Sequence, residues 1–422
     1  MVIHPRLKSS AGGSRGQSLL SEAGGLAEAI NLEVIHAEVV PLQRRNPSTL
    51  FGSGAVKRLD DIIKRGGAGG GLVDVCIVDA PLTPVQQRNL ERDWECKVID
   101  RTGLILEIFG ARARTREGRL QVELAALSYQ RSRLVRSWTH LERQRGGAGF
   151  MGGPGETQIE TDRRLIGKRI TRLKKDLDEV KRTRQLHRKA RKKVPYPVVA
   201  LVGYTNAGKS TLFNRLTKAK VKTEDQLFAT LDPTMRGLKT ASGRMVILSD
   251  TVGFISRLPT ELVNAFHATL EEVVEADIIV HVRDAAHADT EYQKEDVLQV
   301  LKELGLDDTV EETLIEVLNK IDLLDTQERE ALANRTHRSN IPAIPLSAVT
   351  GEGCERLTTA IDEKNTESFK IHEVSLPHGE GAKLAWLYDH GEIFERRDDE
   401  EDIFLKVRID GVNWAKFRQR DN

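Results

Sequence analysis

The sequence predicts a mixed α/β protein with an N-terminal parallel α/β domain, an antiparallel two-helix coiled-coil hairpin, a phosphate-loop (P-loop) domain and a small C-terminal α+β module. Short apolar runs alternate with amphipathic helices near the start of the chain. A heptad-spaced apolar stripe follows, and after it come a strand, a glycine loop and a helix. The expected limits are 1–23 for a disordered tail, then 24–118, 119–193, 194–365 and 366–422.

The composition is that of a globular protein. The chain has 422 residues, of which 39% are hydrophobic and 30% charged, and its net charge of +1 demands no acidic partner. Cys76, Cys96 and Cys354 lack metal-ligand spacing and fit a reducing compartment. The sequence has no apolar run near the ~18 residues of a membrane span, and its first residues lack the apolar segment of a secretory signal. We therefore expect a cytoplasmic monomer that does not bind membranes.

Alternating strands and helices predict the N-terminal domain. Residues 33–42 and 73–79 are apolar enough for short buried strands, and 53–67 between them has helical spacing and a glycine stop. Residues 83–94 predict a further helix, because a threonine that can cap it precedes a proline in the first turn. The run 97–109 predicts another strand. This alternation indicates a parallel sheet.

Matching apolar stripes on two long helices predict the hairpin. They comprise Leu120, Leu124, Leu127, Leu134 and Leu141 in the first helix, and Ile159, Ile166, Ile170, Leu173, Leu177 and Val180 in the second. Residues 163–193 hold 15 Lys and Arg against 3 Asp and Glu, a net charge of +12. These charges are either a solvated outer face or a surface for a polyanion. Their single sign favours the polyanion, whose attraction would depend on salt.

A glycine-rich loop from Gly146 to Gly155 joins the two helices. It could be a phosphate cradle, a linker between domains or an exposed tip. No strand precedes it and no Lys-Ser pair follows it, which argues against a phosphate cradle. Because it joins two helices of one register, it is not a domain linker. A tip whose backbone can lie close to RNA is the favoured interpretation, and a merely loose turn is the alternative.

Residues 196–216 combine a strand, a glycine loop and a helix. Gly203, Gly208, Lys209 and Ser210 complete the pattern GxxxxGK[ST]. In this pattern backbone N–H groups surround phosphate oxygens, the lysine pairs with the outer phosphates, and the serine hydroxyl can ligate Mg²⁺. The sequence therefore predicts a nucleotide site at this turn.

Three further strand ends indicate guanine as the base. DxxG places Asp250 toward the Mg²⁺ shell and Gly253 beside the γ-phosphate. In Asn-Lys-x-Asp, Asp322 can accept hydrogen bonds from the N1–H and 2-amino groups of guanine, which adenine does not offer. Asn319 would brace the loops, and the Lys320 stem would cover the base. The Ser347-Ala348 turn would offer a backbone N–H to guanine O6, at the edge where parallel strands end.

A threonine between the P-loop and Asp250 must close on Mg²⁺ and the γ-phosphate if GTP and GDP are to be distinguished. Thr230 is the favoured residue and Thr234 the alternative, while an ordinary loop threonine would fit the spacing of either. Phe254 follows DxxG, where many signalling GTPases have a glutamine that orients water. Phenylalanine cannot do so, and we expect slow hydrolysis that a partner stimulates.

The complete prediction for this site is a set of loop residues and three roles. Lys209, Thr230 and Gly253 are expected to act in catalysis, and Ser210 and Thr230 to hold Mg²⁺. The residues expected to contact GTP or GDP are Gly203, Tyr204, Thr205, Asn206, Ala207, Gly208, Lys209, Ser210, Thr211, Phe228, Ala229, Thr230, Leu231, Asp232, Asp250, Thr251, Val252, Gly253, Asn319, Lys320, Ile321, Asp322, Ser347, Ala348 and Val349.

Taken together, GYTNAGKST, FATLDPT, DTVGF, NKID and SA resemble the HflX branch of translation-factor-related GTPases. Outside this domain, GGAGFMGGPGETQIETDRR resembles the loop-helix segment of that family, and PSTLFGSGAVKRL with TPVQQRNLE resembles its N-terminal domain. The resemblance covers about residues 30–365. Met235 stands where the family pattern suggests a second threonine, which affects the choice of switch residue.

The resemblance implies a GTPase that binds the large ribosomal subunit in its GTP state and dissociates stalled or idle ribosomes into subunits. It also implies that the hairpin reaches into the peptidyl-transferase region. An ATP site in the N-terminal domain is suspected for the family, but no motif for it stands in this sequence. The alternative is an RNA-binding or ribosome assembly module that uses GTP as a switch with negligible hydrolysis. A membrane-signalling GTPase fits poorly, since neither terminus has a lipidation motif.

The last part of the chain predicts a small α+β module without a catalytic constellation. Residues 369–376 and 403–410 read as strands, 379–391 as a helix, and 414–419 as a short second helix. The acidic run 396–402 predicts an exposed hairpin turn. We expect this module to pack against the P-loop domain.

Overall fold

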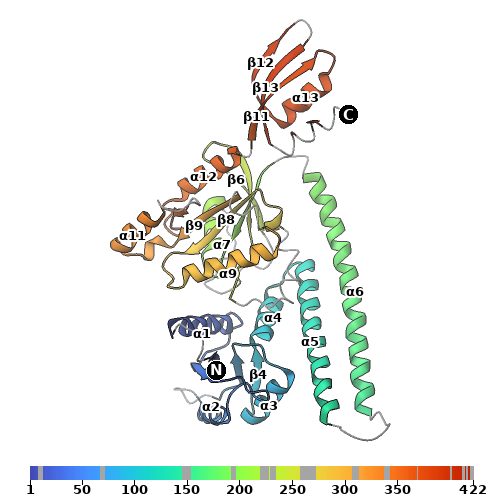
Figure 1. The fold of residues 1–422 in the computed structure, drawn as a ribbon, viewed down its shortest axis with the longest axis vertical. Helices are drawn as coiled ribbons and strands as arrows, with labels where there is room; N and C mark the ends of the chain where they lie inside the picture. The colour runs from blue at the N-terminus through green and yellow to red at the C-terminus, as the bar shows by residue number, and fades with distance from the viewer. Residues whose placement is uncertain are drawn as a thin grey trace.

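The structure is a computed structural model, and it describes residues 1–7, 13–66, 72–144, 154–191, 196–218, 228, 234–256, 272–306, 313–336, 343–367, 369–399, 402–410, 414 and 417–418. Figure 1 shows a parallel α/β part at one end, a long pair of helices alongside it, a second α/β part above, and a small sheet with a helix at the other end. The predicted mixed α/β class with its four parts is confirmed. Among the described residues, no helix is both long and apolar enough to cross a membrane.

The N-terminal part is a four-stranded parallel sheet in the order β2-β1-β3-β4. Its strands are β1 (Val2–Leu7), β2 (Ala37–Leu42), β3 (Val75–Val78) and β4 (Lys97–Asp100). Its helices are α1 (Gly13–Glu28), α2 (Ser53–Arg65), α3 (Pro84–Trp94) and α4 (Arg101–Arg112). The predicted cap of α3 is present as a capping box, in which the Thr83 side chain accepts from the Gln86 N–H and the Gln86 side chain accepts from the Thr83 N–H.

The prediction of a disordered tail over 1–23 is wrong. Residues 2–7 form the inner strand β1, and residues 13–28 form α1. Val2 and Ile3 are fully buried, because β1 pairs with β2 on one side and with β3 on the other. Pro5 obscured the pattern, since proline lowers the expectation of an inner strand. It lies beyond the two residues of β1 that pair with β3, so its missing N–H interrupts no ladder there.

The prediction of a strand over 97–109 is wrong beyond Asp100. The chain turns at this residue and continues as α4. The Asp100 carboxylate accepts a hydrogen bond of 2.9 Å from the Gly103 N–H, which caps the helix. A continuous apolar run suits a buried helix as well as a buried strand, so periodicity did not separate the two.

Two antiparallel helices, α5 (Arg116–Gln144) and α6 (Pro154–Arg191), form the hairpin (Figure 1). Ile170, Leu173 and Leu177 on α6 are buried, as the apolar stripe predicted. Helix α6 has 38 residues and spans about 57 Å. Of the tip expected at 146–155, residues 146–153 lie outside the described residues. Residues 154 and 155 already belong to α6, which begins at Pro154, a position where proline suits a helix.

The P-loop part has a six-stranded sheet in the order β10-β9-β8-β5-β7-β6, in which only β6 is antiparallel to its neighbour. The strands are β5 (Val198–Val202), β6 (Thr234–Lys239), β7 (Met245–Asp250), β8 (Ile278–Asp284), β9 (Leu314–Asn319) and β10 (Ala343–Pro345). The helices are α7 (Lys209–Thr217), α9 (Thr290–Glu303), the 3-10 turn η1 (Ile321–Leu323), α11 (Thr326–Thr336) and α12 (Cys354–Glu367).

The C-terminal part is an antiparallel sheet in the order β11-β13-β12 with one helix against it. Its elements are β11 (Phe369–Pro377), α13 (Gly381–His390), β12 (Glu392–Asp398) and β13 (Asp402–Asp410). Strand β12 was not predicted, since its charged sequence hides the pattern. The expected acidic turn is shorter than 396–402, because β12 extends to Asp398 and β13 starts at Asp402.

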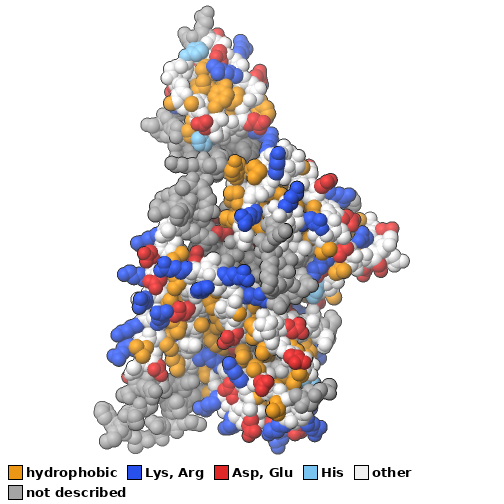
Figure 2. Space-filling view, turned by 180° about the vertical axis from the view of Figure 1, so that it is seen from behind, with side chains coloured by type: hydrophobic (Ala, Val, Ile, Leu, Met, Phe, Trp, Pro, Cys, Tyr) orange, Lys and Arg blue, Asp and Glu red, His pale blue; other side chains and the backbone are white. Residues whose placement is uncertain are grey.

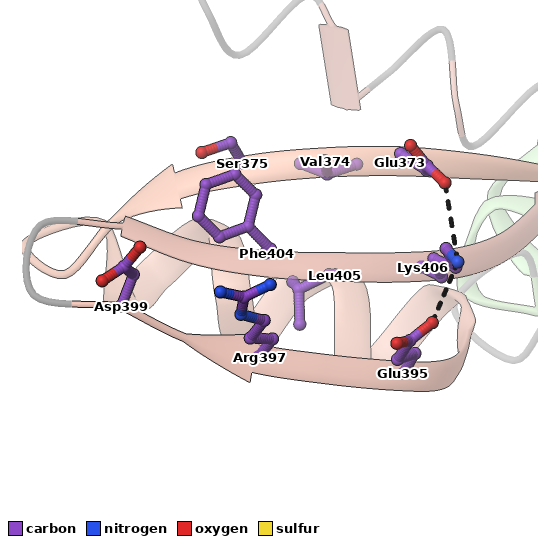
Figure 3. Close-up of a pocket in the computed structure, with 9 residues that line it drawn as sticks. All are labelled: Glu373, Val374, Ser375, Glu395, Arg397, Asp399, Phe404, Leu405 and Lys406. Atoms are coloured by element: carbon purple, nitrogen blue, oxygen red, sulfur yellow. Dashed lines mark ion pairs between the residues drawn. The ribbon is translucent and has the colours of Figure 1, made fainter.

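The outer face of this small sheet carries a shallow pocket of about 470 Å³. Figure 3 shows Lys406 between Glu373 and Glu395, with ion pairs of 3.7 and 3.0 Å. These partners neutralise the lysine. On the side toward the P-loop part, Arg244 lies 3.9 Å from Glu392.

Candidate nucleotide site

The P-loop lies between β5 and α7, and two of its glycines have backbone angles that other residues avoid. Gly203 has a φ of 148° and Gly208 a φ of 91°. A Cβ atom at Gly203 would lie 2.1 Å from the Val282 carbonyl oxygen, and one at Gly208 would lie 2.2 Å from Asn319 Nδ2. Only glycine fits either position, so the P-loop can pack closely against β8 and Asn319 in the conformation that presents backbone N–H groups to a phosphate.

Lys209 begins α7, and its side chain is buried against the loop. Its ammonium group donates to the carbonyl oxygens of Gly203 at 3.0 Å and Tyr204 at 2.8 Å. Burial lowers the pKa of Lys209 to about 8, although the charge of Asp250 opposes the change. An ammonium group has three N–H donors, so its orientation is fixed while one donor remains for a ligand.

The side chains of Ser210 and Asp250 bring oxygen atoms close together beside the P-loop. The Ser210 hydroxyl donates to Asp250 Oδ2 at 2.7 Å. Asp250 ends β7, which pairs with β5, and this pairing brings the aspartate beside the P-loop. Hydroxyl and carboxylate oxygens suit Mg²⁺, which is held by few protein ligands together with phosphate oxygens and water. The described residues contain no cluster of three or more His, Cys, Asp or Glu that would form a protein-only metal site.

The DxxG turn is attached directly to the P-loop. The Thr205 N–H donates to the Phe254 carbonyl at 2.7 Å, and the Phe254 N–H donates to the Gly203 carbonyl at 3.0 Å. A Cβ atom at Gly253 would lie 2.8 Å from Thr205 Cγ2 and 3.0 Å from Lys209 Nζ. The Phe254 ring is 2% exposed and belongs to the core. The DxxG turn therefore contributes backbone groups to the nucleotide site, and the Phe254 side chain packs in the apolar core.

Asn319 connects the loops that surround the base side. Its Nδ2 donates to the Ala207 carbonyl at 2.8 Å, and its Oδ1 accepts from the Ala348 N–H at 2.9 Å. Lys320 has a φ of 65° and forms an ion pair of 2.8 Å with Asp284. Asp322 is exposed beside these loops.

Sequence reasoning missed Asp284. It ends β8, the strand between β5 and β9, and it holds the Lys320 stem through the ion pair. The strand-like run 278–282, apolar except for His281, ends just before this aspartate and was the signal that could have found it. The carboxyl ends of β5, β7, β8 and β9 thus all contribute to one edge.

The structure describes most of the predicted ligand set but only part of its switch segment. Ala229, Thr230, Leu231 and Asp232 lie outside the described residues. Phe228 is buried, and Thr234 is the first residue of β6, opposite Asp250 in the strand register. The remaining predicted residues stand on the P-loop, the DxxG turn, or the loops that follow β9 and β10.

Family models match nearly the whole chain. Residues 17–110 match a GTP-binding GTPase N-terminal model and 112–191 a GTP-binding GTPase middle region. Residues 198–320 match a model described as a 50S ribosome-binding GTPase, and 331–420 match the HflX C-terminal domain. A GTPase HflX from Magnetococcus marinus is 51% identical over 93% of this chain and 88% of its own length. The chain belongs to the HflX GTPase family. GTP hydrolysis is accordingly its activity, with GTP and GDP as its ligands.

Other HflX relatives are similar over the same extent. A GTPase HflX from Escherichia coli is 43% identical over 95% of this chain and 92% of that protein. Among solved structures, a GTP-binding protein from Sulfolobus solfataricus in complex with GDP covers 87% of this chain and 99% of that chain, with 23% identity and a TM-score of 0.44. The resemblance to HflX proposed from the motifs is confirmed.

Proposed function

We propose that this HflX-family GTPase binds the large ribosomal subunit in its GTP state and dissociates stalled or idle ribosomes into subunits. The observation that carries the proposal is one long basic helix, α6, which directly precedes the first strand of a GTPase that can change state. The family model described as 50S ribosome-binding supports the choice of partner. The protein would act in the cytoplasm, as a monomer.

The exposed basic side chains of α6 would contact rRNA. They are Arg163, Arg164, Lys168, Arg169, Arg172, Lys174, Lys175 and Arg182, of which Arg169 is paired with Glu123. Figure 2 shows Lys and Arg side chains gathered along the hairpin in the view from behind. Their number and single sign suit a phosphate backbone, which attracts Lys and Arg regardless of base sequence. The glycine tip at 146–155 would extend this contact.

At the nucleotide site, Lys209 would use its remaining donor for a β- or γ-phosphate oxygen. Ser210, with Thr230 or Thr234, would hold Mg²⁺, and Asp250 would lie in its shell. When bound, this ion neutralises charge on the phosphates. Asp322 would select guanine. We also propose the domain limits 119–193 for the hairpin, 194–365 for the GTPase domain and 366–422 for the C-terminal module.

Hydrolysis would be slow without the ribosome. The buried Phe254 ring cannot orient an attacking water, and another group must do so when the partner closes the site. The same observation also fits the alternative, a GTP-switched RNA-binding or ribosome assembly module with negligible hydrolysis, so stimulation by large subunits must distinguish the two.

The decisive experiment measures GTP hydrolysis with and without purified large ribosomal subunits at two salt concentrations. Large stimulation that falls with salt is expected. The variant Lys209→Ala should lose GTP-dependent subunit binding, with Lys302→Ala on α9 as a matched control. Tight GTP-state binding without stimulation would favour the assembly module, and undiminished binding by Lys209→Ala would overturn the switch.

A further inference from the structure

Arg101, the first residue of α4, lies in a buried contact between the N-terminal part and the nucleotide site. Its side chain is 4% exposed and forms ion pairs with Asp79 at the end of β3 and with Glu22 on α1. It also donates to the Ser256 carbonyl at 2.5 Å. Ser256 stands three residues after Gly253, and α4 therefore holds the backbone that leaves the DxxG turn.

The P-loop enters the same contact through Tyr204. Its hydroxyl lies within hydrogen-bond distance of the Glu22 carboxylate and of the Ser256 N–H, and 2.6 Å from Ser256 Oγ. Burial and the Glu22 charge raise the pKa of Tyr204, which keeps the phenol protonated. One glutamate of α1 thus binds both Arg101 and the P-loop tyrosine.

A second contact joins α4 to the segment before the predicted switch threonines. The rings of Phe109 on α4 and Phe228 are 4.7 Å apart in an edge-to-face arrangement. Both belong to one apolar cluster that also contains Tyr204 and Phe254. Helix α4 therefore contacts both the segment that leaves the DxxG turn and the segment before the predicted switch threonines.

The residue before Arg101 faces the hairpin. Asp100 accepts from the Leu82 N–H at 3.1 Å and from the Tyr129 hydroxyl on α5 at 2.6 Å. Arg133, one turn further along α5, lies 3.6 Å from Asp100 and donates to the Tyr129 hydroxyl. Two consecutive residues thus have partners on opposite sides: Asp100 binds the hairpin, and Arg101 binds the nucleotide site.

We propose that α4 couples the nucleotide site to the hairpin, with Arg101 as the positioning residue for the DxxG segment and Asp100 as the contact that transmits its movement to Tyr129. Arg101 is held by two carboxylates and Asp100 by several donors, so neither side chain can absorb a shift by changing rotamer. Close packing makes the helix move as a unit. The inference rests on the GTP switch of the proposed function, but it does not require the ribosome.

A double-mutant cycle on the isolated full-length protein tests this coupling. Tyr129→Phe removes one hydroxyl at the hairpin, and Arg101→Lys keeps the charge while losing the forked geometry. The readout is the ratio of the dissociation constants for a non-hydrolysable GTP analogue and for GDP, because coupling between sites is reciprocal. Tyr292→Phe, a half-exposed tyrosine on α9, is the matched control.

Tyr129→Phe should change this ratio about fivefold, the lower end of typical coupling between sites. In the Arg101→Lys background the same substitution should have almost no further effect, because the contact is already released. An unchanged ratio in Tyr129→Phe, or an undiminished effect in the double variant, would overturn the coupling. If the parent protein failed to bind GTP, the proposed function itself would fail as well.

Discussion

The N-terminal sheet and the GTPase sheet both carry polar side chains where their parallel strands end, but they surround these side chains differently. In the GTPase sheet, Gly203 and Gly208 lack side chains, so the P-loop backbone packs closely against the Val282 carbonyl and the Asn319 side chain. In the N-terminal sheet the corresponding edge is filled, since Asp79 binds His4 at 2.6 Å and also binds Arg101.

The difference shows that strand direction alone does not determine whether the carboxyl edge of a sheet binds a ligand. Parallel strands deliver polar groups to one edge in both sheets. Whether that edge receives a ligand depends on the backbone around it. Glycines at positive φ let the P-loop of one sheet adopt a shape that presents backbone N–H groups to phosphate. In the other sheet a buried arginine pairs with the carboxylates and makes the edge an internal contact.

The strongest test of this contrast disrupts the close packing of the P-loop. In Gly208→Ala the new Cβ would lie 2.2 Å from Asn319 Nδ2, at a φ of 91°. GTP affinity should fall at least about 100-fold, since backbone strain and displacement of Asn319 together cost about 3 kcal/mol. Binding of a fluorescent GTP analogue measures the effect.

Gly54→Ala in α2 of the N-terminal part is the matched control, because a Cβ there meets nothing within 4 Å. It should leave GTP affinity unchanged and make the helix slightly more stable. If the Gly208→Ala protein bound GTP as tightly as the Gly54→Ala protein, the role assigned to Gly208 in the P-loop would be contradicted.

The next test removes the group that fills the N-terminal edge. Arg101→Met leaves Asp79 and Glu22 buried without their cation, so it should lower the free energy of unfolding by about 3–5 kcal/mol. Urea unfolding measures the loss. Arg169→Met breaks the half-exposed pair with Glu123 on the hairpin and should cost less than about 1 kcal/mol. Equal losses in the two variants would show that Arg101 is no structural joint.

A smaller effect concerns pH. The pKa of Lys209 lies at about 8 in the protein, and its charged form is the one that pairs with phosphate. Below this pH the lysine is already protonated, whereas above it binding must take up a proton, so affinity falls as pH rises. GDP affinity should decrease about tenfold between pH 7 and pH 9.

Lys209→Arg serves as the reference for this titration, because its guanidinium stays charged at both pH values. Its affinity should therefore depend much less on pH, whatever its absolute value. A parallel decrease in both proteins would assign the pH dependence to another group.

The nucleotide site could be predicted from the sequence because its chemistry is local. The glycine spacing around Lys209, and Asn-Lys-x-Asp after an apolar strand, each specify a conformation within a few residues. The N-terminal strand β1 could not be predicted, because Val2 and Ile3 give too short a pattern and their burial comes from two neighbouring strands. Helix α4 was missed for a related reason, since its apolar sequence fits either kind of element.

The joint around Arg101 was beyond sequence reasoning altogether. Glu22, Arg101 and Ser256 carry no motif, and Tyr204 was predicted only as a nucleotide contact of the P-loop. Only the docking of the two sheets brings them together. Their roles depend on tertiary position, which no local pattern contains.

The contacts that form this joint also constrain how the chain acquires its structure during synthesis. Arg101 meets a partner 155 residues later in the sequence, and Glu22 meets one 182 residues later. Chains are made from the N-terminus, and contacts of such separation form late because a long loop must close first. The N-terminal sheet is therefore synthesised first, and its contacts with Ser256 and Tyr204 at the nucleotide site form only after the second sheet has emerged.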